Sequence, residues 1–130
     1  MRLALVLLLV LAGTAACSST PAAPAPSAGT SLTISVDPGK GGTPVEWTLT
    51  CDPPGGSHPD PSAACAALTG ADPFAPVPTD RVCAQVFGGP QTATVTGTWQ
   101  GKPVNATFSR TDGCQTQRWD ALVPLLPAAQ

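Results

Sequence analysis

The cysteines are the side chains of this 130-residue chain with the clearest chemistry. Cys17 stands apart near the start, and four more lie in the region whose composition suits a folded domain. These four are Cys51, Cys65, Cys83 and Cys114. An even set of cysteines in an exported domain normally forms structural disulfides. We therefore expect two disulfides, and the spacing alone leaves all three pairings open.

The chain lacks the residue patterns that metal binding and covalent catalysis need. The chain has no C-x-x-C spacing, and its single histidine, His58, lies between Ser57 and Pro59. Zinc sites typically hold two cysteines separated by two to four residues, a spacing that this chain lacks. Ser57 has no G-x-S-x-G turn around it, so it does not indicate a hydrolase triad. We expect no catalytic residue, no metal and no cofactor, and we interpret His58 as a loop residue held by local hydrogen bonds.

The charges argue against nucleic acid as a partner. Removal of Arg2 with a signal peptide leaves five of the six basic residues against eight acidic ones, a net charge of about −3. The remaining basic residues stand singly: Lys40, Arg81, Lys102, Arg110 and Arg118. Nucleic-acid binding requires clustered positive charge, so we exclude it.

The N-terminal region predicts export. Residues 1–16 carry one positive charge, an apolar run of about ten residues and then small residues, as in a secretory signal peptide. The run is too short for a membrane span, which needs about 20 residues. The signal ends at Cys17, which suggests a bacterial lipoprotein with a lipidated Cys17; the alternative is a plain secreted protein. Residues 17–31 are rich in Pro, Ala and Ser and predict an extended tether. We expect a secreted, extracellular protein that contacts a membrane only through a lipid anchor on its outer face.

Alternation of apolar and polar residues predicts four strands, at residues 31–37, 45–51, 92–100 and 104–110. Short Gly-containing turns join the first two and the last two, so the strands form antiparallel hairpins.

One helix is expected at residues 62–70, with Ser62 or Asp60 as N-cap and Gly70 as C-cap. Prolines make residues 71–80 irregular. The class is α+β, with a single domain over residues 32–126 and a tail at 127–130.

The segment RVCAQVFGGPQ, residues 81–91, raises the functional question. Four uncharged residues after Cys83 suit an extended strand, and Gly88, Gly89 and Pro90 then stop it. The segment is either a strand end pinned by a disulfide or a loop that the disulfide holds rigid for presentation to a partner.

Four blocks of sequence carry a family resemblance. In chain order they are TLTCDPPGGSHPDPSAAC, RVCAQVFGGP, GTWQGKPV and SRTDGC. Together they resemble the Streptomyces subtilisin inhibitor family over residues 32–119. The resemblance implies a five-stranded antiparallel sheet with two short helices. It also implies two disulfides, Cys51 with Cys65 and Cys83 with Cys114.

The same resemblance implies where a protease would bind. The bond presented to the protease lies two residues after the third cysteine of the domain, which makes it Gln85–Val86. Cys83, Ala84, Phe87 and Gly88 belong to the contacting loop. Gln85 would enter the specificity pocket, and its long unbranched stem fits a subtilisin-like cleft better than a trypsin-like or chymotrypsin-like pocket.

The expected function is therefore inhibition of a subtilisin-like serine protease, and the family's homodimer is a further expectation. The alternative is a tethered interaction domain that keeps the inhibitor scaffold without inhibitory activity.

Overall fold

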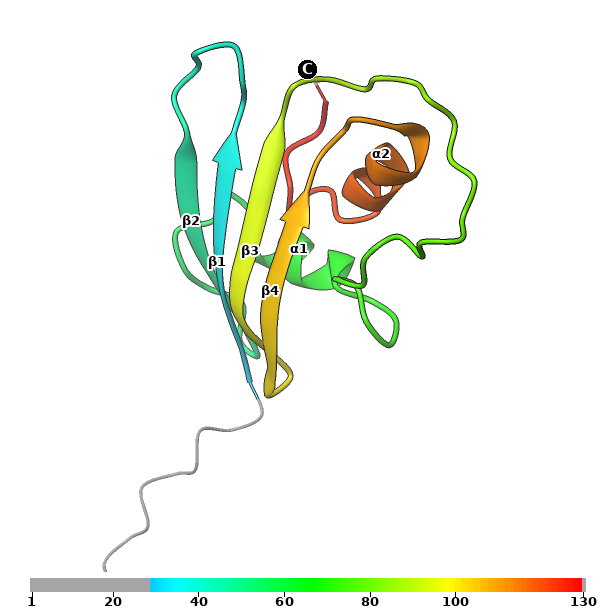
Figure 1. The fold of residues 1–130 in the computed structure, drawn as a ribbon. Helices are drawn as coiled ribbons and strands as arrows, with labels where there is room; N and C mark the ends of the chain where they lie inside the picture. Colours follow the sequence, from blue (N-terminus) through cyan, green and yellow to red (C-terminus); the bar gives the residue numbers. More distant parts are fainter. Residues whose placement is uncertain (1–28, 130) are drawn as a thin grey trace, which may run out of the picture.

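The computed structural model describes residues 29–129, which form a four-stranded antiparallel sheet with two short helices (Figure 1). The strands are β1 (Thr30–Asp37), β2 (Val45–Cys51), β3 (Thr92–Trp99) and β4 (Lys102–Phe108), and the helices are α1 (Pro61–Ala67) and α2 (Gly113–Asp120). The strand order is β2-β1-β3-β4. Each strand coincides closely with a segment that the alternation predicts. The predicted signal peptide, Cys17 and most of the predicted tether lie outside the described residues.

The expectation of a five-stranded sheet is wrong, because the described residues contain four strands. The further segment whose composition suits a strand, residues 84–87, pairs with none of the four. The Ala84 carbonyl accepts instead from Gly113, the first residue of α2. The Gly88 N–H, just after the segment, donates to the carbonyl of Arg110 in the connection between β4 and α2. An extended segment becomes a strand only when a neighbouring strand takes its backbone hydrogen bonds.

The sheet buries one face and exposes the other. The register places Ile34 of β1 between Trp47 of β2 and Val95 of β3, and side chains of like character therefore share a face. The buried side chains of the sheet are Leu32, Ile34, Val36, Leu49, Ala93, Val95, Trp99, Val104, Ala106 and Phe108. The alternate positions are mainly serine and threonine, so the opposite face remains polar.

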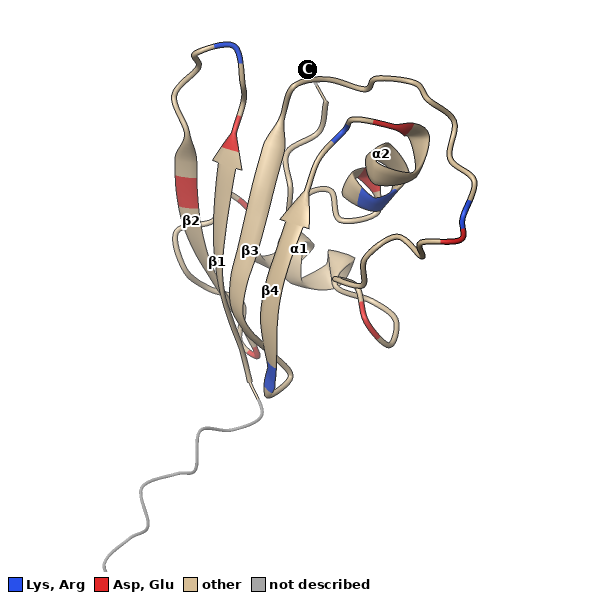
Figure 2. Ribbon diagram, in the orientation of Figure 1, with Lys and Arg blue, Asp and Glu red and all other residues tan. Residues whose placement is uncertain are grey.

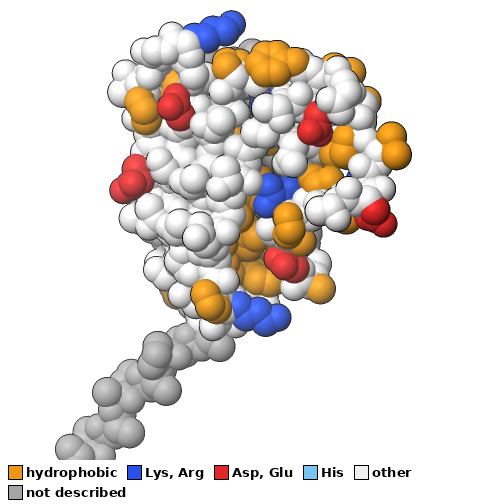
Figure 3. Space-filling model, in the orientation of Figure 1, with side chains coloured by type: hydrophobic (Ala, Val, Ile, Leu, Met, Phe, Trp, Pro, Cys, Tyr) orange, Lys and Arg blue, Asp and Glu red, His pale blue; other side chains and the backbone are white. Residues whose placement is uncertain are grey.

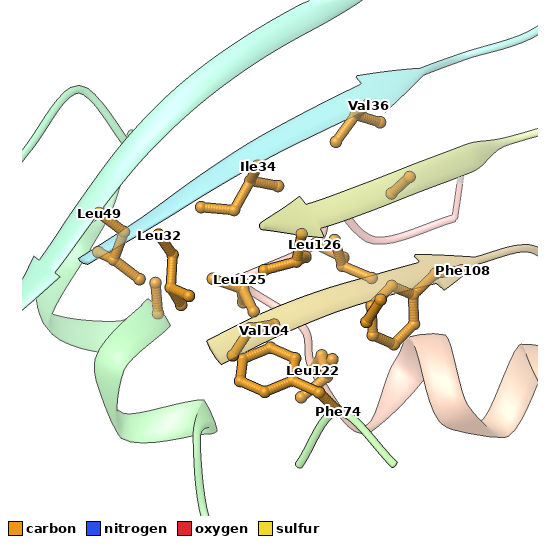
Figure 4. Packing of buried hydrophobic residues seen from close by; sticks show 14 of the residues in the cluster. Leu32, Ile34, Val36, Leu49, Phe74, Val104, Phe108, Leu122, Leu125 and Leu126 are labelled. Carbon is orange, nitrogen blue, oxygen red and sulfur yellow. The ribbon is translucent and has the colours of Figure 1, made fainter. Parts of the chain in front are cut away.

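The segment after α2 completes the core. Leu122, Leu125 and Leu126 are almost fully buried, and Figure 4 shows them with Phe74 packed against the side chains of the sheet. The Trp119 indole N–H donates to the carbonyl of Pro127 at 2.7 Å, which ties α2 to the chain end. Burial of each leucine side chain contributes about 1.5–3 kcal/mol, so this segment is an integral part of the fold.

The first disulfide joins β2 to α1. Cys51 and Cys65 are bonded, the pairing that the resemblance implied, with their Cα atoms 5.8 Å apart. Asp60 is the N-cap of α1 and accepts from the Ala63 N–H at 3.2 Å. The helix ends at Ala67 with Leu68 as its cap, so the expectation that it runs to Gly70 is wrong.

His58 lies buried in this corner of the molecule, with 5% of its surface exposed. Its Nδ1 accepts from the Asp60 N–H at 3.0 Å, so its Nε2 carries the proton and donates to the Leu125 carbonyl at 3.0 Å. The ring also packs edge-on against Trp47. Both nitrogens are therefore occupied, and His58 is a hydrogen-bonded loop residue as expected. Only the Asp60 bond is local, because Leu125 lies 67 residues away.

Arg118 holds the irregular segment 71–80 beside β4. Its guanidinium donates to the carbonyls of Ala75 (2.8 Å), Phe74 (2.9 Å) and Thr107 (2.6 Å). Burial lowers the pKa of Arg118, and the negative charge of Asp72 opposes this shift. An arginine pKa lies far above neutrality, so the side chain remains charged.

The surface charges are scattered. Figure 2 shows the basic and acidic residues distributed singly over the described chain, without a basic face. Within residues 29–129, no helix is long and apolar enough to cross a membrane.

Candidate functional site

Residues 81–91, called the exposed loop below, run outside the sheet on the side that carries α2 and enter the start of β3 (Figure 1). The loop carries three of the four large hydrophobic side chains that are exposed among the described residues. These are Val82, Val86 and Phe87, with 96%, 64% and 66% of their surfaces exposed. Figure 3 shows apolar side chains at the edge of the molecule where this loop runs. Exposed apolar side chains that gather in this way mark interaction sites.

The N-terminal side of the exposed loop is fixed by a disulfide and a hydrogen bond. Cys83 is bonded to Cys114 in the first turn of α2, the pairing that the resemblance implied, with Cα atoms 5.3 Å apart. One residue later, the carbonyl of Ala84 accepts from the Gly113 N–H at 2.8 Å. These two contacts hold the backbone immediately before Gln85.

The C-terminal side is fixed by a reciprocal contact with Arg110. The Gly88 N–H donates to the carbonyl of Arg110 at 2.7 Å, and the Arg110 Nε donates to the carbonyl of Gly88 at 3.1 Å. Gly89 has a φ of +135°, a conformation that favours glycine over any other residue. The loop is therefore held on both sides of the three residues that lie between the anchors.

Those three residues, Gln85, Val86 and Phe87, are exposed. The Gln85 side-chain amide donates to the carbonyl of Cys83 at 3.1 Å and contacts the loop's own backbone rather than the core. The Gln85–Val86 peptide bond thus lies in an exposed segment whose two ends are both anchored. The six predicted loop residues are consecutive in the chain and all lie in the exposed loop: Cys83, Ala84, Gln85, Val86, Phe87 and Gly88.

Sequence reasoning missed Arg110 and its partners. Arg110 is 5% exposed, and its NH1 lies 2.7 Å from the Asp120 carboxylate. Its guanidinium also lies over the Trp119 ring, 5.7 Å from the centroid. The charge pattern gives no signal of such a role, because Arg110 is a single arginine among scattered charges. The one available hint was its position four residues before the disulfide cysteine Cys114.

One group of potential metal ligands occurs in residues 29–129, formed by Cys83, Asp112 and Cys114 with ligand atoms within 4.8 Å of one another. The two sulfurs are bonded to each other, so neither is a thiolate. The Asp112 carboxylate caps α2 by accepting from the Gln115 N–H at 2.9 Å. All three side chains therefore have a structural role, and the group does not form a metal site.

Comparison with known proteins gives a consistent family. A family model described as subtilisin inhibitor-like matches residues 25–111. Subtilisin inhibitor-like protein 1 of Streptomyces cacaoi is 39% identical over 83 residues, covering 58% of this chain and 74% of that protein. Subtilisin inhibitor-like protein 15 of Streptomyces bikiniensis is 37% identical over 103 residues, covering 69% of this chain and 87% of that protein.

A solved structure is also similar. It is that of Streptomyces caespitosus sermetstatin in complex with Bacillus licheniformis subtilisin. It has 27% sequence identity and a TM-score of 0.47, and it covers 74% of this chain and 97% of that one. The relatives are named as inhibitors rather than as enzymes, in agreement with the expectation that this chain has no enzyme activity.

Proposed function

Because this chain belongs to the subtilisin inhibitor-like family, we propose that it inhibits a subtilisin-like serine protease by presenting Gln85–Val86 as a substrate-like bond. The observation that carries the proposal is the anchoring of the exposed loop on both sides of this bond. The Ala84 carbonyl is held at 2.8 Å by Gly113, and the Gly88 N–H is held at 2.7 Å by Arg110. A loop fixed in this way loses little further freedom when a protease binds it, whereas a mobile loop loses about 0.5–1.5 kcal/mol for each side chain that becomes ordered.

The chemistry of a serine protease explains why such a loop inhibits rather than being consumed. The protease serine attacks the carbonyl of Gln85, the bond to Val86 breaks, and the amine on Val86 becomes the leaving group. In an ordinary substrate this amine diffuses away. Here the disulfide of Cys83 and the contacts of Gly88 keep the two ends together. The amine can then attack the acyl-enzyme and restore the peptide bond.

The exposed side chains fit the other subsites of an extended cleft. Val86 and Phe87 follow the bond, and Val82 precedes Gln85 by three residues. Apolar side chains near the centre of an interface supply most of its binding energy. Gln85 itself would place an apolar stem in the primary pocket. Its side-chain amide would weaken binding by about 1–3 kcal/mol if it found no hydrogen-bond partner there.

Titration of a subtilisin-like protease with the oxidised protein tests the proposal. We expect a stoichiometric endpoint of about one inhibitor per protease. The Gln85→Asp variant should abolish it, because a carboxylate without a partner is very costly to bury in the pocket. The side chain of Gln85 contacts only its own loop, so this variant should retain the wild-type unfolding transition.

The opposite result would favour the alternative function. If the protein does not inhibit and is cut rapidly between Cys83 and Pro90, it keeps the scaffold only. A tethered interaction domain would then be the better interpretation. Equal inhibition by wild type and Gln85→Asp would place the presented bond elsewhere in the chain.

We also propose that the protein is secreted and that a lipid on Cys17 anchors it to the outer face of the membrane. The described chain begins beside the β3–β4 turn, where the Gly101 N–H donates to the carbonyl of Gly29 at 3.2 Å. The exposed loop enters β3 at its other end, at Thr92 (Figure 1). Residue 29, where a tether from Cys17 would reach the domain, therefore lies at the opposite end of β3 from the exposed loop. The pairing of two copies, which the resemblance implied, stays a prediction.

Replacement of Cys17 by alanine should release the protein from the membrane fraction into the medium, because the lipid-accepting thiol is lost. Immunoblotting of the two fractions measures this, with Ser18→Ala as the matched control. Unchanged retention of Cys17→Ala in the membrane fraction would contradict lipid anchoring and leave a plain secreted protein.

A further inference from the structure

We propose that Arg110, held by Asp120, is a positioning residue that keeps the amine side of a cleaved loop in place, so that religation outcompetes hydrolysis. The inference rests on the inhibitory function proposed above. It concerns the C-terminal half of the exposed loop, which the disulfide does not restrain. Cys83 precedes the Gln85–Val86 bond, so its disulfide retains the acyl half, while the half that begins at Val86 is held by other contacts.

The burial of Arg110 is the first observation. The side chain is 5% exposed, although it carries a full charge. A buried charge is tolerated when it has a fixed partner, and the Asp120 carboxylate lies 2.7 Å from NH1. The guanidinium also faces the ring of Trp119, which is itself 1% exposed. Arg110 is therefore fixed to the core and to α2 before it contacts the loop.

The contact with Gly88 is the second observation. The Arg110 Nε donates to the Gly88 carbonyl at 3.1 Å, and the Arg110 carbonyl accepts from the Gly88 N–H at 2.7 Å. A hydrogen bond from a guanidinium is roughly twice as strong as one between neutral groups. The two bonds restrain both polar groups of one residue, so Gly88 has little freedom to rotate or withdraw.

Steric closeness on the α2 side is the third observation. A Cβ atom added at Gly88 would lie 2.5 Å from the Thr116 hydroxyl and 3.3 Å from the Arg110 carbonyl. The backbone of Gly88 therefore packs directly against these groups, with no space for a side chain. Two hydrogen bonds and this packing together fix the position of Gly88.

The position of Gly88 limits where the amine can go. Cleavage breaks the bond between the Gln85 carbonyl carbon and the Val86 nitrogen, and it leaves an ester on the protease serine and an amine that has gained one proton. Water then gives a free carboxylate, whereas the amine re-forms the peptide bond and returns the proton and the serine hydroxyl. Val86 lies two residues before Gly88, so a fixed Gly88 confines the amine to about 7 Å. Confinement near the reacting carbon raises the rate of the return reaction.

The test compares Arg110→Met, which keeps the apolar stem and removes every donor, with wild type and with Arg118→Met. Arg118 is a matched control because its guanidinium also holds a loop by carbonyl contacts, but those contacts go to Phe74 and Ala75. Its third contact goes to the carbonyl of Thr107 in β4, also outside the exposed loop. Asp120→Asn supplies a second variant at an exposed side chain, in case Arg110→Met does not fold. Near-UV circular dichroism and thermal unfolding establish which variants are folded.

Two readouts report on the loop itself. The first is amide hydrogen exchange at Gly88 in the free protein, measured by NMR. The second is the rate at which catalytic amounts of a subtilisin-like protease cut Gln85–Val86, with the final ratio of cut to intact inhibitor. We expect Arg110→Met to raise the exchange rate, the cutting rate and the cut-to-intact ratio by at least about tenfold, with a smaller rise for Asp120→Asn. Arg118→Met should lower the unfolding temperature and leave all three within about twofold of wild type.

Suppose that wild type inhibits and that Arg110→Met and Asp120→Asn are folded. If all three values for both variants then lay within about twofold of wild type, the role of Arg110 would be overturned. Equal increases in Arg118→Met would also overturn it, since they would reflect general loss of stability. A wild-type protein that is cut without inhibiting overturns the function proposed above, and the religation role with it. The two failures are therefore distinguished by the wild-type titration alone.

Discussion

Loss of the Cys83–Cys114 disulfide, by Cys83→Ser combined with Cys114→Ser, is expected to convert the protein from an inhibitor into a substrate of the same protease. The disulfide holds the backbone two residues before the presented bond, where Cys83 meets the first turn of α2. Without it, the acyl half is held only by the bond from Gly113 to the carbonyl of Ala84. A displacement of about 1 Å at a reacting centre slows a reaction by about 100-fold. Religation should slow by about this factor when the acyl half moves, so the rate of net cleavage should rise by about 100-fold.

The second disulfide provides the matched control. Loss of Cys51–Cys65, which joins β2 to α1, removes a shorter loop closure, with a sequence separation of 14 against 31, and leaves the exposed loop untouched. Chain entropy predicts losses of about 4 kcal/mol for the Cys83–Cys114 pair and about 3 kcal/mol for this one. Both variants should therefore be less stable, and only the first should be cut rapidly.

Chromatography of the cleavage products and inhibition constants measure the difference, at a temperature where circular dichroism shows both variants folded. If both variants inhibited equally, or were cut equally fast, rigidity near Cys83 would not be the basis of inhibition.

Replacement of Gln85 by lysine is expected to redirect the protein toward trypsin-like proteases. The primary pocket of those enzymes carries a carboxylate that pairs with a buried cation. Charge pairs of this kind at interfaces contribute about 1.5–7 kcal/mol. A gain of about 4 kcal/mol, or about 1,000-fold in affinity, is therefore expected. Because the Gln85 side chain bonds only to the carbonyl of Cys83, the fold should be unaffected.

Gln85→Leu is the control for this change. It removes the amide while keeping an apolar stem, so affinity for a subtilisin-like protease should rise by about 1–3 kcal/mol and trypsin-like binding should not appear. Inhibition constants against one protease of each class measure both variants. A lysine variant with unchanged preference would show that residue 85 does not enter the primary pocket.

Much of the fold is encoded in local patterns. Leu32, Ile34 and Val36 alternate with polar residues in the sequence, and they line one buried face in the structure. Period-2 alternation reports a half-buried strand directly, and this is why all four strands could be predicted. The N-cap of α1 was narrowed to Ser62 or Asp60 for a similar reason, because a cap acts on a backbone group only a few residues away, and the structure shows that it is Asp60.

Other elements depend on contacts that local patterns do not contain. Helix α2 buries only Cys114 and Trp119, so it has no apolar stripe, and the family resemblance rather than the pattern implied a second helix. The family resemblance implied the fifth strand, and the described residues contain four. Residues 84–87 suit a strand, but an extended segment shows nothing in its own sequence about whether a partner strand exists. Arg110 contacts Gly88 across 22 residues, and its importance is visible only when the two segments are placed together.

The anchors of the exposed loop come from a single stretch of five residues, 110–114, which covers the end of the β4–α2 connection and the first two residues of α2. Arg110, Gly113 and Cys114 hold the loop there, while Val86 and Phe87 lie largely in solvent. The residues that anchor the loop are therefore different from the exposed residues that are available to a partner. If residues 85–87 contact the protease as proposed, they can be exchanged without disturbing the core, and the scaffold can acquire new targets by a few substitutions. The same separation makes residues 85–87 a natural region for randomised libraries on a constant framework.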